Sequence, residues 1–170
     1  MPEPRAVLVA AAILLFAFLG LTFPDIDQPL PLDHRSALTH SIIPAALAML
    51  RRWARPIAAG LALGIGLHLA ADVFPNAMTG YATVKLPFAG SIGPGASYAW
   101  LALNSLGCTA LGAWLARSEV ADAIVRRLLL AAVVLVGAAY LFVTDGGWPA
   151  LAICGAVAWI AYRTGRLRRG

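Results

Sequence analysis

Residues 6–27 read AVLVAAAILLFAFLGLTFPDID, and this stretch indicates both the fold class and the place of a polar site. Its first part, Ala6–Phe23, is an uncharged apolar run, and Pro24 then begins a segment with two aspartates. A helix that crosses the hydrocarbon of a bilayer needs about 20 apolar residues. The run is longer than the apolar part of a typical signal peptide and lacks a small-residue cleavage pattern, so we expect a retained membrane span.

The whole chain has the composition of a membrane protein. Of its 170 residues, 61% are apolar and 12% are charged, whereas soluble domains are usually about half apolar and about a quarter charged. A soluble fold this apolar would expose large adhesive patches. The net charge of +5 does not indicate nucleic-acid binding, because the basic residues stand at the ends of apolar runs and form no patch interleaved with aromatic residues.

The apolar runs predict an all-α, polytopic bundle of about six transmembrane helices, forming one integral membrane domain over residues 1–170. The second run is short for a span, and we expect its first turn, with His40, to line a polar site. An alternative has five spans, with this second run re-entrant. Gly60 and Gly64 match the small-xxx-small pattern of close helix packing. The expected spans are Ala6–Phe23, Ala37–Trp53, Ile57–Phe74, Ala96–Ala116, Leu128–Val143 and Trp148–Tyr162.

The arginines predict the orientation of these spans, because cytoplasmic loops of membrane proteins are enriched in basic residues. With the N-terminus in the cytoplasm and six alternating spans, only Arg35 and Lys85 fall on the outer side. Both termini are therefore expected to be cytoplasmic. The basic residues that fall inside are Arg5, Arg51, Arg52, Arg55, Arg117, Arg126, Arg127, Arg163, Arg166, Arg168 and Arg169.

The histidines and half of the acidic residues gather at the expected outer face. They belong to the end of the first span, the loop after it, the start of the second span and the end of the third. Ionisable groups at membrane depth are costly and usually mark a functional site, and a divalent cation would compensate several carboxylates together. We expect the segments 24–41 and 68–95 to form a metal site. The candidate ligands are Asp25, Asp27, His34, His40, His68 and Asp72.

The spacing of these residues limits how they can act. If their segment is extended, Asp25 and Asp27 point the same way; the alternative is that both are loop acids facing water. His68 and Asp72 stand at i and i+4 on one helix face, which suits two ligands, or a ligating histidine oriented by the aspartate.

The residues after Pro31 lead into the expected second helix, for which Asp33 or Ser36 is a natural N-cap. His34 and His40 are six residues apart, which on a helix separates them by about 240°. Both can therefore reach one ion only if His34 belongs to the loop.

A mixed set of imidazoles and carboxylates suits Zn²⁺, with Mn²⁺ as the alternative, whereas Mg²⁺ and Ca²⁺ prefer oxygen ligands. The two glutamates, Glu3 and Glu119, are expected on the cytoplasmic side, so a general base has to be an aspartate, unless a metal-bound hydroxide acts unaided. We assign Asp27 to this catalytic role. We expect Arg35 to grip an anionic substrate group such as a phosphate; for it and Lys85 the alternative is contact with lipid headgroups.

Five short blocks occur in a characteristic order, and over about residues 20–95 they resemble the YdjM-like family of membrane-bound, metal-dependent hydrolases, some of whose members are under LexA control. The resemblance implies the inner membrane of a bacterium, with the site facing the periplasm or exterior. It also places the chain near zinc-dependent phospholipase C and nuclease enzymes. The blocks are Pro24-Asp25-Ile26-Asp27, His34-Arg35, Thr39-His40-Ser41, His68 with Asp72, and Leu86-Pro87-Phe88.

We therefore expect hydrolysis of a membrane lipid or other phosphoester by a metal-activated water. The alternative is a non-catalytic metal-binding protein, either a structural clasp or a carrier, for which Asn104, Ser105 and Thr109 would supply polar groups in the fourth span. A type-2 phosphatidate phosphatase mechanism is not indicated, because Ala62 stands where its arginine is required. No nucleic-acid partner is expected, and the sequence does not indicate an oligomeric state.

Overall fold

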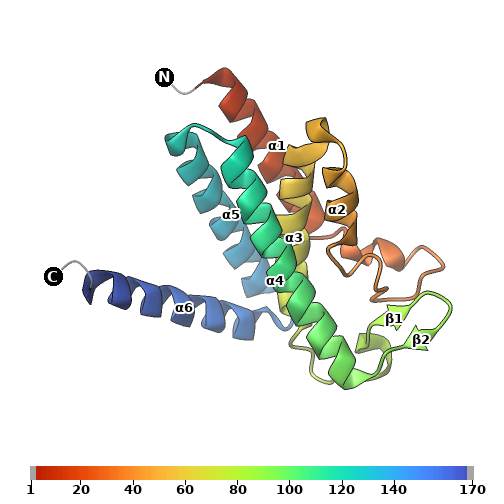
Figure 1. Ribbon diagram of the computed structural model, residues 1–170. Coiled ribbons are helices and arrows are strands. Elements are labelled where there is room, and N and C mark those ends of the chain that lie inside the picture. Colours follow the sequence, from red (N-terminus) through yellow and green to blue (C-terminus); the bar gives the residue numbers. More distant parts are fainter. Residues whose placement is uncertain (1–2, 168–170) are drawn as a thin grey trace.

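The computed structural model describes residues 3–167, apart from the side chains of residues 161 and 165–167, and these residues are mostly helical (Figure 1). The tail arginines Arg168 and Arg169 and the side chain of Arg166 thus lie outside the described part. The elements in chain order are α1 (Pro4–Gly20), η1 (Pro24–Asp27), α2 (Ile43–Met49), η2 (Arg52–Ala54), α3 (Arg55–Asp72), η3 (Gly80–Ala82), β1 (Lys85–Leu86), β2 (Gly90–Ser91), α4 (Pro94–Glu119), α5 (Ala123–Val143) and α6 (Gly147–Leu167).

Helix α3 is central and packs against α1 and α4 (Figure 1), and its glycines lie at both contacts. A β-carbon on Gly60 would lie 2.6 Å from Cβ of Phe16 on α1. One on Gly64 would meet the backbone of Ala17 and Gly20, also on α1. The missing side chains let the two backbones approach closely, which confirms the packing predicted for the small-xxx-small pattern.

Within the described residues, three helical segments are long and apolar enough to cross a membrane: Arg52–Asp72, α4 and α5. Helix α1 is also apolar but has only 17 residues. Large apolar side chains point outward from these helices, among them Leu15, Leu103 and Leu135. Such a surface is adhesive in water but is compatible with lipid, and it indicates a membrane protein. The structure thus confirms the predicted helical fold class and shows helices that are apolar enough for a membrane, as predicted.

The helix expected over Ala37–Trp53 is much shorter than predicted. Only Ile43–Met49, seven residues, is helical, and at 1.5 Å per residue this is about 10 Å long, too short to cross the hydrocarbon. Pro44 stands in its first turn, where the absent N–H is not needed. His40 was expected in the first helical turn and instead lies in the irregular segment before it.

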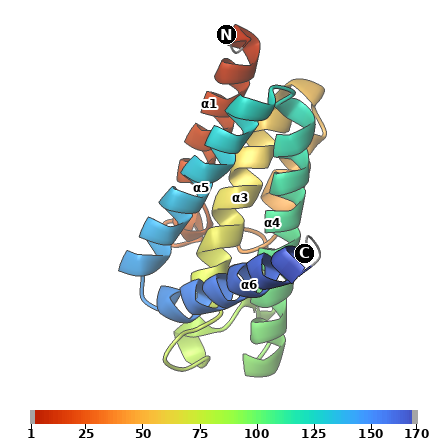
Figure 2. The same cartoon turned by 90° about the vertical axis from the view of Figure 1, so that its left-hand side faces the viewer.

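Helix α6 differs from the other long helices in direction. It turns away from the bundle after Gly146 and projects outward from it, as Figure 1 shows, so that it points toward the viewer in Figure 2. Its contacts with the bundle include Ala150, which is buried with Ala71 of α3 and Leu141 of α5. Most of its remaining described side chains are exposed.

A small hairpin connects α3 to α4 and ties together two parts of the chain. Its strands pair antiparallel, with Lys85 opposite Ser91. On its other side β1 meets the segment before α2: the Lys85 amide donates to Arg35 O over 3.0 Å, and the Ala37 amide donates to Lys85 O over 2.8 Å. This pairing brings the backbone at Arg35 next to the loop that follows α3.

Candidate metal centre

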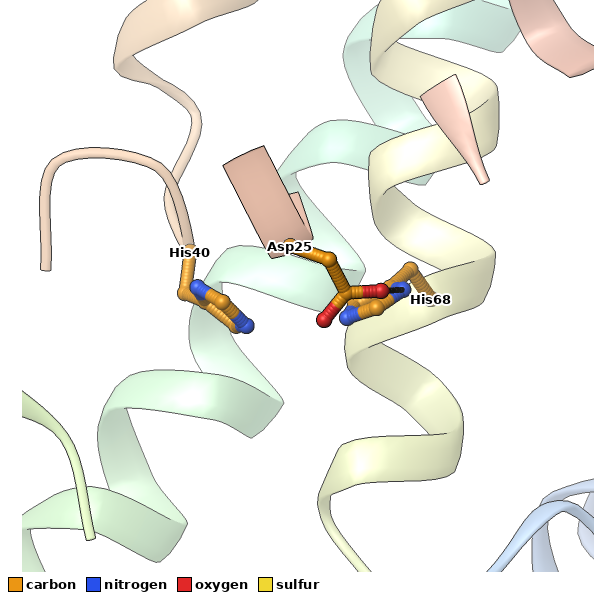
Figure 3. A group of neighbouring side chains, drawn as sticks. All are labelled: Asp25, His40 and His68. Carbon is orange, nitrogen blue, oxygen red and sulfur yellow. Dashed lines mark ion pairs between the residues drawn. The ribbon is translucent and has the colours of Figure 1, made fainter. Parts of the chain in front are cut away.

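Three elements that are distant in sequence converge on one group of side chains (Figure 3). Asp25 comes from η1, His40 from the irregular segment before α2, and His68 from α3. One ligand atom of each lies within 4.8 Å of the others, and the two histidines are buried. Figure 3 shows the carboxylate of Asp25 directed toward the imidazoles. The predicted convergence of these three residues is confirmed, and the group could hold a metal ion.

Asp72 completes this group. Its Oδ2 atom lies 3.4 Å from Nε2 of His40 and 3.3 Å from Nε2 of His68. Two ligands of a tetrahedral ion with bonds of about 2.0–2.1 Å are about 3.3–3.4 Å apart. Each of these two contacts with Asp72 therefore has the spacing of neighbouring ligands of one ion. We call Asp25, His40, His68 and Asp72 the metal cluster.

The hydrogen bonds of the imidazoles show which nitrogen atoms are free to bind a cation. Nδ1 of His68 lies 2.8 Å from the carbonyl oxygen of Leu21, which can only accept, so Nδ1 carries the proton. Nδ1 of His40 lies 3.0 Å from Oδ2 of Asp27, and a carboxylate also accepts. When the rings are neutral, Nε2 of each carries a lone pair that faces Asp72.

Two polar atoms at the centre of the cluster lack a partner in the described part of the chain. Nε2 of His40 and Oδ2 of Asp72 are buried and have no hydrogen-bond partner among the described residues. Buried polar atoms are rarely left unpaired. A divalent cation would satisfy both atoms and the Nε2 lone pair of His68 at once, so the residues present fit a metal ion.

Asp27 holds His40 rather than joining the cluster. Its side chain is fully buried, and Oδ2 accepts hydrogen bonds from the Ser36 amide at 2.8 Å and from the Thr39 hydroxyl at 2.9 Å, in addition to His40. Burial raises the pKa of Asp27, but the hydrogen bonds from His40, Ser36 and Thr39 outweigh it, and the net pKa is lowered. Asp27 is thus an ionised carboxylate that orients the imidazole of His40.

The two aspartates of the Asp25-Ile26-Asp27 block do not point the same way. The segment is a 3-10 turn, in which residues two apart are separated by about 120° around the axis, so the extended geometry weighed for them is wrong. Asp25 consequently faces His68, with Oδ2 4.0 Å from Nδ1, while Asp27 turns toward His40.

Arg35 contacts the cluster through Oδ1 of Asp72, the carboxylate oxygen that does not face the two histidines. Nη2 donates to Oδ1 of Asp72 over 2.7 Å, and Nη1 donates to the carbonyl oxygen of Ala82 over 2.6 Å. The side chain is buried, and the backbone has a positive φ of 59°, which is unusual for a residue other than glycine. Its terminal nitrogens are thus engaged within the protein, although we expected them to grip a substrate.

His34 lies outside the cluster. Its ring stacks on Tyr81 with centroids 3.9 Å apart, and Nδ1 is 4.0 Å from Oδ1 of Asp27. Burial lowers the pKa of His34 further than the charge of Asp27 raises it, so the ring is neutral at pH 7. His34 thus approaches Asp27 and lies with its ring centroid 6.1 Å from that of His40, but it is not a member of the group formed by Asp25, His40 and His68.

The helix cap predicted before α2 differs from the structure. Asp33 has a positive φ of 61° and stands well before α2, so neither it nor Ser36 caps that helix. The ammonium group of Lys85 donates to the carbonyl oxygen of Tyr81, in the η3 turn that precedes the hairpin, over 2.6 Å.

Several residues that hold the cluster were not identified from the sequence. The Tyr140 hydroxyl of α5 lies 3.0 Å from Nδ1 of His68, and Trp100 of α4 donates from Nε1 to the carbonyl oxygen of His40 over 2.8 Å. Gln28 donates to Oδ1 of Asp25 over 3.1 Å. Aromatic residues with polar tips are common near membrane interfaces for other reasons, so only the fold identifies these partners.

The fold and the site together define a helical membrane protein with an Asp/His cluster that could hold a metal ion. Comparisons of the chain with models of protein families, with curated proteins and with solved structures return no match. The resemblance drawn from the sequence blocks therefore stays a prediction.

Proposed function

We propose that the protein is a membrane-bound, metal-dependent hydrolase that cleaves a phosphoester. The observation that carries the proposal is that Oδ2 of Asp72 lies at ligand spacing from Nε2 of His40 and from Nε2 of His68. Two imidazoles and one carboxylate suit Zn²⁺, with Mn²⁺ as the alternative. The ordered sequence blocks that resemble metal-dependent hydrolases support the choice of reaction.

A bound divalent ion would supply Lewis-acid polarisation of a phosphoryl oxygen and activation of a water molecule. His40, His68 and Asp72 would hold it. Asp25 is the most exposed member of the cluster, with 42% of its side chain accessible, so it can serve as a fourth ligand or accept a proton from water. We now assign Asp27 and Arg35 to positioning, because each is hydrogen-bonded to a cluster residue.

The second candidate is a structural metal clasp without turnover. The observation that favours it is that the cluster joins η1, the segment before α2 and the end of α3, and an ion there would cross-link them. A clasp predicts metal-dependent unfolding without hydrolysis. Both candidates require the ion; they differ in whether water reaches it.

We also propose that the cluster faces the non-cytoplasmic side. The opposite end of the bundle carries the basic residues: Arg55 pairs with Glu119 at 3.3 Å, and Arg126 donates to the carbonyl oxygen of Val120 over 3.0 Å. Under the positive-inside rule this end is cytoplasmic. Labelling of single cysteines placed near Arg51 and near Phe88 in intact cells would test this orientation.

The experiment for the proposed function combines metal analysis with turnover. Purified protein in detergent is analysed for zinc and manganese, and assayed with bis(p-nitrophenyl) phosphate, beside His40→Ala, His68→Ala and the control His34→Ala. We expect near-stoichiometric metal and metal-dependent hydrolysis in the wild type and the control, and loss of both in the two cluster variants. Metal without hydrolysis of this or longer phosphodiesters would favour the clasp; folded protein that takes up no metal would refute both candidates.

A further inference from the structure

An open apolar groove adjoins the metal cluster. It has a volume of about 550 Å³ and lies between α1, η1 and α3. Asp25 lines the groove and also belongs to the cluster, so the two features share a carboxylate. The other lining residues are Phe16, Leu19, Thr22, Phe23, Ile26 and Leu61.

The groove extends from the polar site toward the middle of the bundle. Leu61 precedes His68 by seven residues on α3, which corresponds to about 10 Å along the helix axis. Because Arg52–Asp72 is a candidate membrane span, the part of the groove at Leu61 lies at the depth of the hydrocarbon. Leu19 and Ile26, on its wall, are 46% and 45% exposed, so the groove is open to the surrounding lipid.

A ligand of this groove has to be apolar over most of its length and charged at one end. The apolar wall offers nothing to a small soluble phosphoester, whereas the cluster offers nothing to a plain hydrocarbon. Asp25 and Asp72 repel an anion unless an ion at the cluster compensates them. An anionic headgroup is therefore complementary to the cluster only when the metal is present.

Two other grooves on the bundle lack this combination. One of about 340 Å³, between α3, α4 and α6, is lined by residues such as Leu67, Leu106 and Ile153, and one of about 330 Å³ lies between α1 and α5. Neither has a histidine or an acidic residue among its lining residues. They match the ordinary lipid-facing surface of a helix bundle.

We propose that the groove beside Asp25 holds an acyl chain of a membrane phospholipid whose phosphate lies at the metal cluster. This inference rests on the proposed function for the metal, and it makes the substrate a lipid that enters sideways from the bilayer. The acyl chain contributes affinity through apolar contact, while the metal orients the phosphate.

The test uses phosphatidic acid with a photoreactive diazirine on its acyl chain, in nanodiscs that contain the zinc-loaded protein. After irradiation, the cross-linked residues are mapped by mass spectrometry. We expect labels to concentrate on residues 16–26 and on Leu61, and to decrease when a chelator removes the metal. Inorganic phosphate in excess should displace little label, since it lacks the chain.

Variants that fill the groove make the test specific. Leu19→Trp places a bulky ring in the groove, and labelling there should fall about fivefold or more, the equivalent of losing about 1 kcal/mol of apolar contact. Leu15→Trp is the matched control, because Leu15 lies one turn earlier on α1, is 56% exposed and does not line the groove. If Leu19→Trp does not fold, Ile26→Trp replaces it.

Labels spread evenly over the lipid-facing side of α1, or an equal effect of Leu15→Trp and Leu19→Trp, would overturn the inference. Labelling that persists unchanged after the chelator would also overturn it, because the phosphate would then not lie at the metal. Metal content is measured on the same samples. Groove labelling that is absent while the zinc is retained overturns the lipid site alone, whereas failure to bind zinc overturns the proposed function.

Discussion

Arg35 and Asp72 form a largely buried ion pair, with Nη2 of the arginine 2.7 Å from Oδ1 of the aspartate. The pair occupies one carboxylate oxygen and leaves the other, Oδ2, facing the imidazoles of His40 and His68. Breaking a buried pair by removing one partner is strongly destabilising, because the other charge is left uncompensated. Arg35 thus fixes the orientation in which Asp72 can act as a ligand.

Replacing Arg35 with lysine should weaken metal binding. Lysine keeps the charge but cannot reach Asp72 and the carbonyl oxygen of Ala82 with one planar group. Residues that orient a ligand typically change metal affinity by about 10–100-fold, and we expect a loss in this range from competition with a chromogenic chelator. The control is Arg55→Lys at the other end of the bundle, where Arg55 pairs with Glu119. An equal loss in the control would mean that Arg35 acts only through general stability.

Asp27→Asn should also lower metal affinity while leaving the fold intact. Asparagine offers a neutral acceptor in place of the carboxylate, so it holds the proton on Nδ1 of His40 less strongly. Nε2 is then less often the unprotonated nitrogen that can bind the ion. We expect a decrease of about 10–100-fold, measured by titration calorimetry. Asp145→Asn, at an exposed position, serves as the control and should bind as the wild type does. Unchanged affinity in Asp27→Asn would argue against its role in orienting His40.

Metal binding should release a proton and become tighter as the pH rises. Burial lowers the pKa of His40, but the hydrogen bonds and charges of Asp27 and Asp72 outweigh it, and the net pKa is raised. The metal-free protein therefore keeps a proton on His40 above the ordinary value of about 6.5. That proton stabilises the fold below the unfolded pKa, and the stabilisation is lost as the pH rises through the folded pKa.

The ion has to displace this proton, so calorimetry at pH 7 in two buffers of different ionisation enthalpy should show release of up to about one proton. Affinity that is independent of pH between 6 and 8, with no proton released, would contradict the assignment of His40 as a ligand. His34→Ala should behave as the wild type does, because His34 lies outside the cluster.

Gly64→Ala should destabilise the bundle and weaken the metal cluster together. The added β-carbon meets the backbone of Ala17 and Gly20, so α1 has to move away from α3, and η1 with Asp25 moves with it. Overpacking of this kind costs about 1–3 kcal/mol, which unfolding in a denaturing detergent would measure. Gly155→Ala is the control, because a β-carbon there meets nothing within 4 Å. Equal stability of the two variants would show that α1 and α3 are not in close backbone contact.

The sequence by itself determined the helical, membrane-compatible fold class, because long apolar runs have few other stable solutions. It also identified Asp25, His40 and His68, since costly polar residues in such a chain are few. The close packing of Gly60 and Gly64 followed from local spacing as well. These features depend on composition and on neighbours within a few turns of helix.

Only the tertiary structure decided which of the candidate residues face one another. The turn at η1 separates Asp25 from Asp27, the short α2 leaves His40 in an irregular segment, and Arg35 is engaged by Asp72 and Ala82. Each outcome depends on contacts between residues that are distant in the chain. A sequence pattern reports periodicity along one element, whereas the orientation of a buried carboxylate or imidazole depends on hydrogen-bond partners that packing brings from elsewhere.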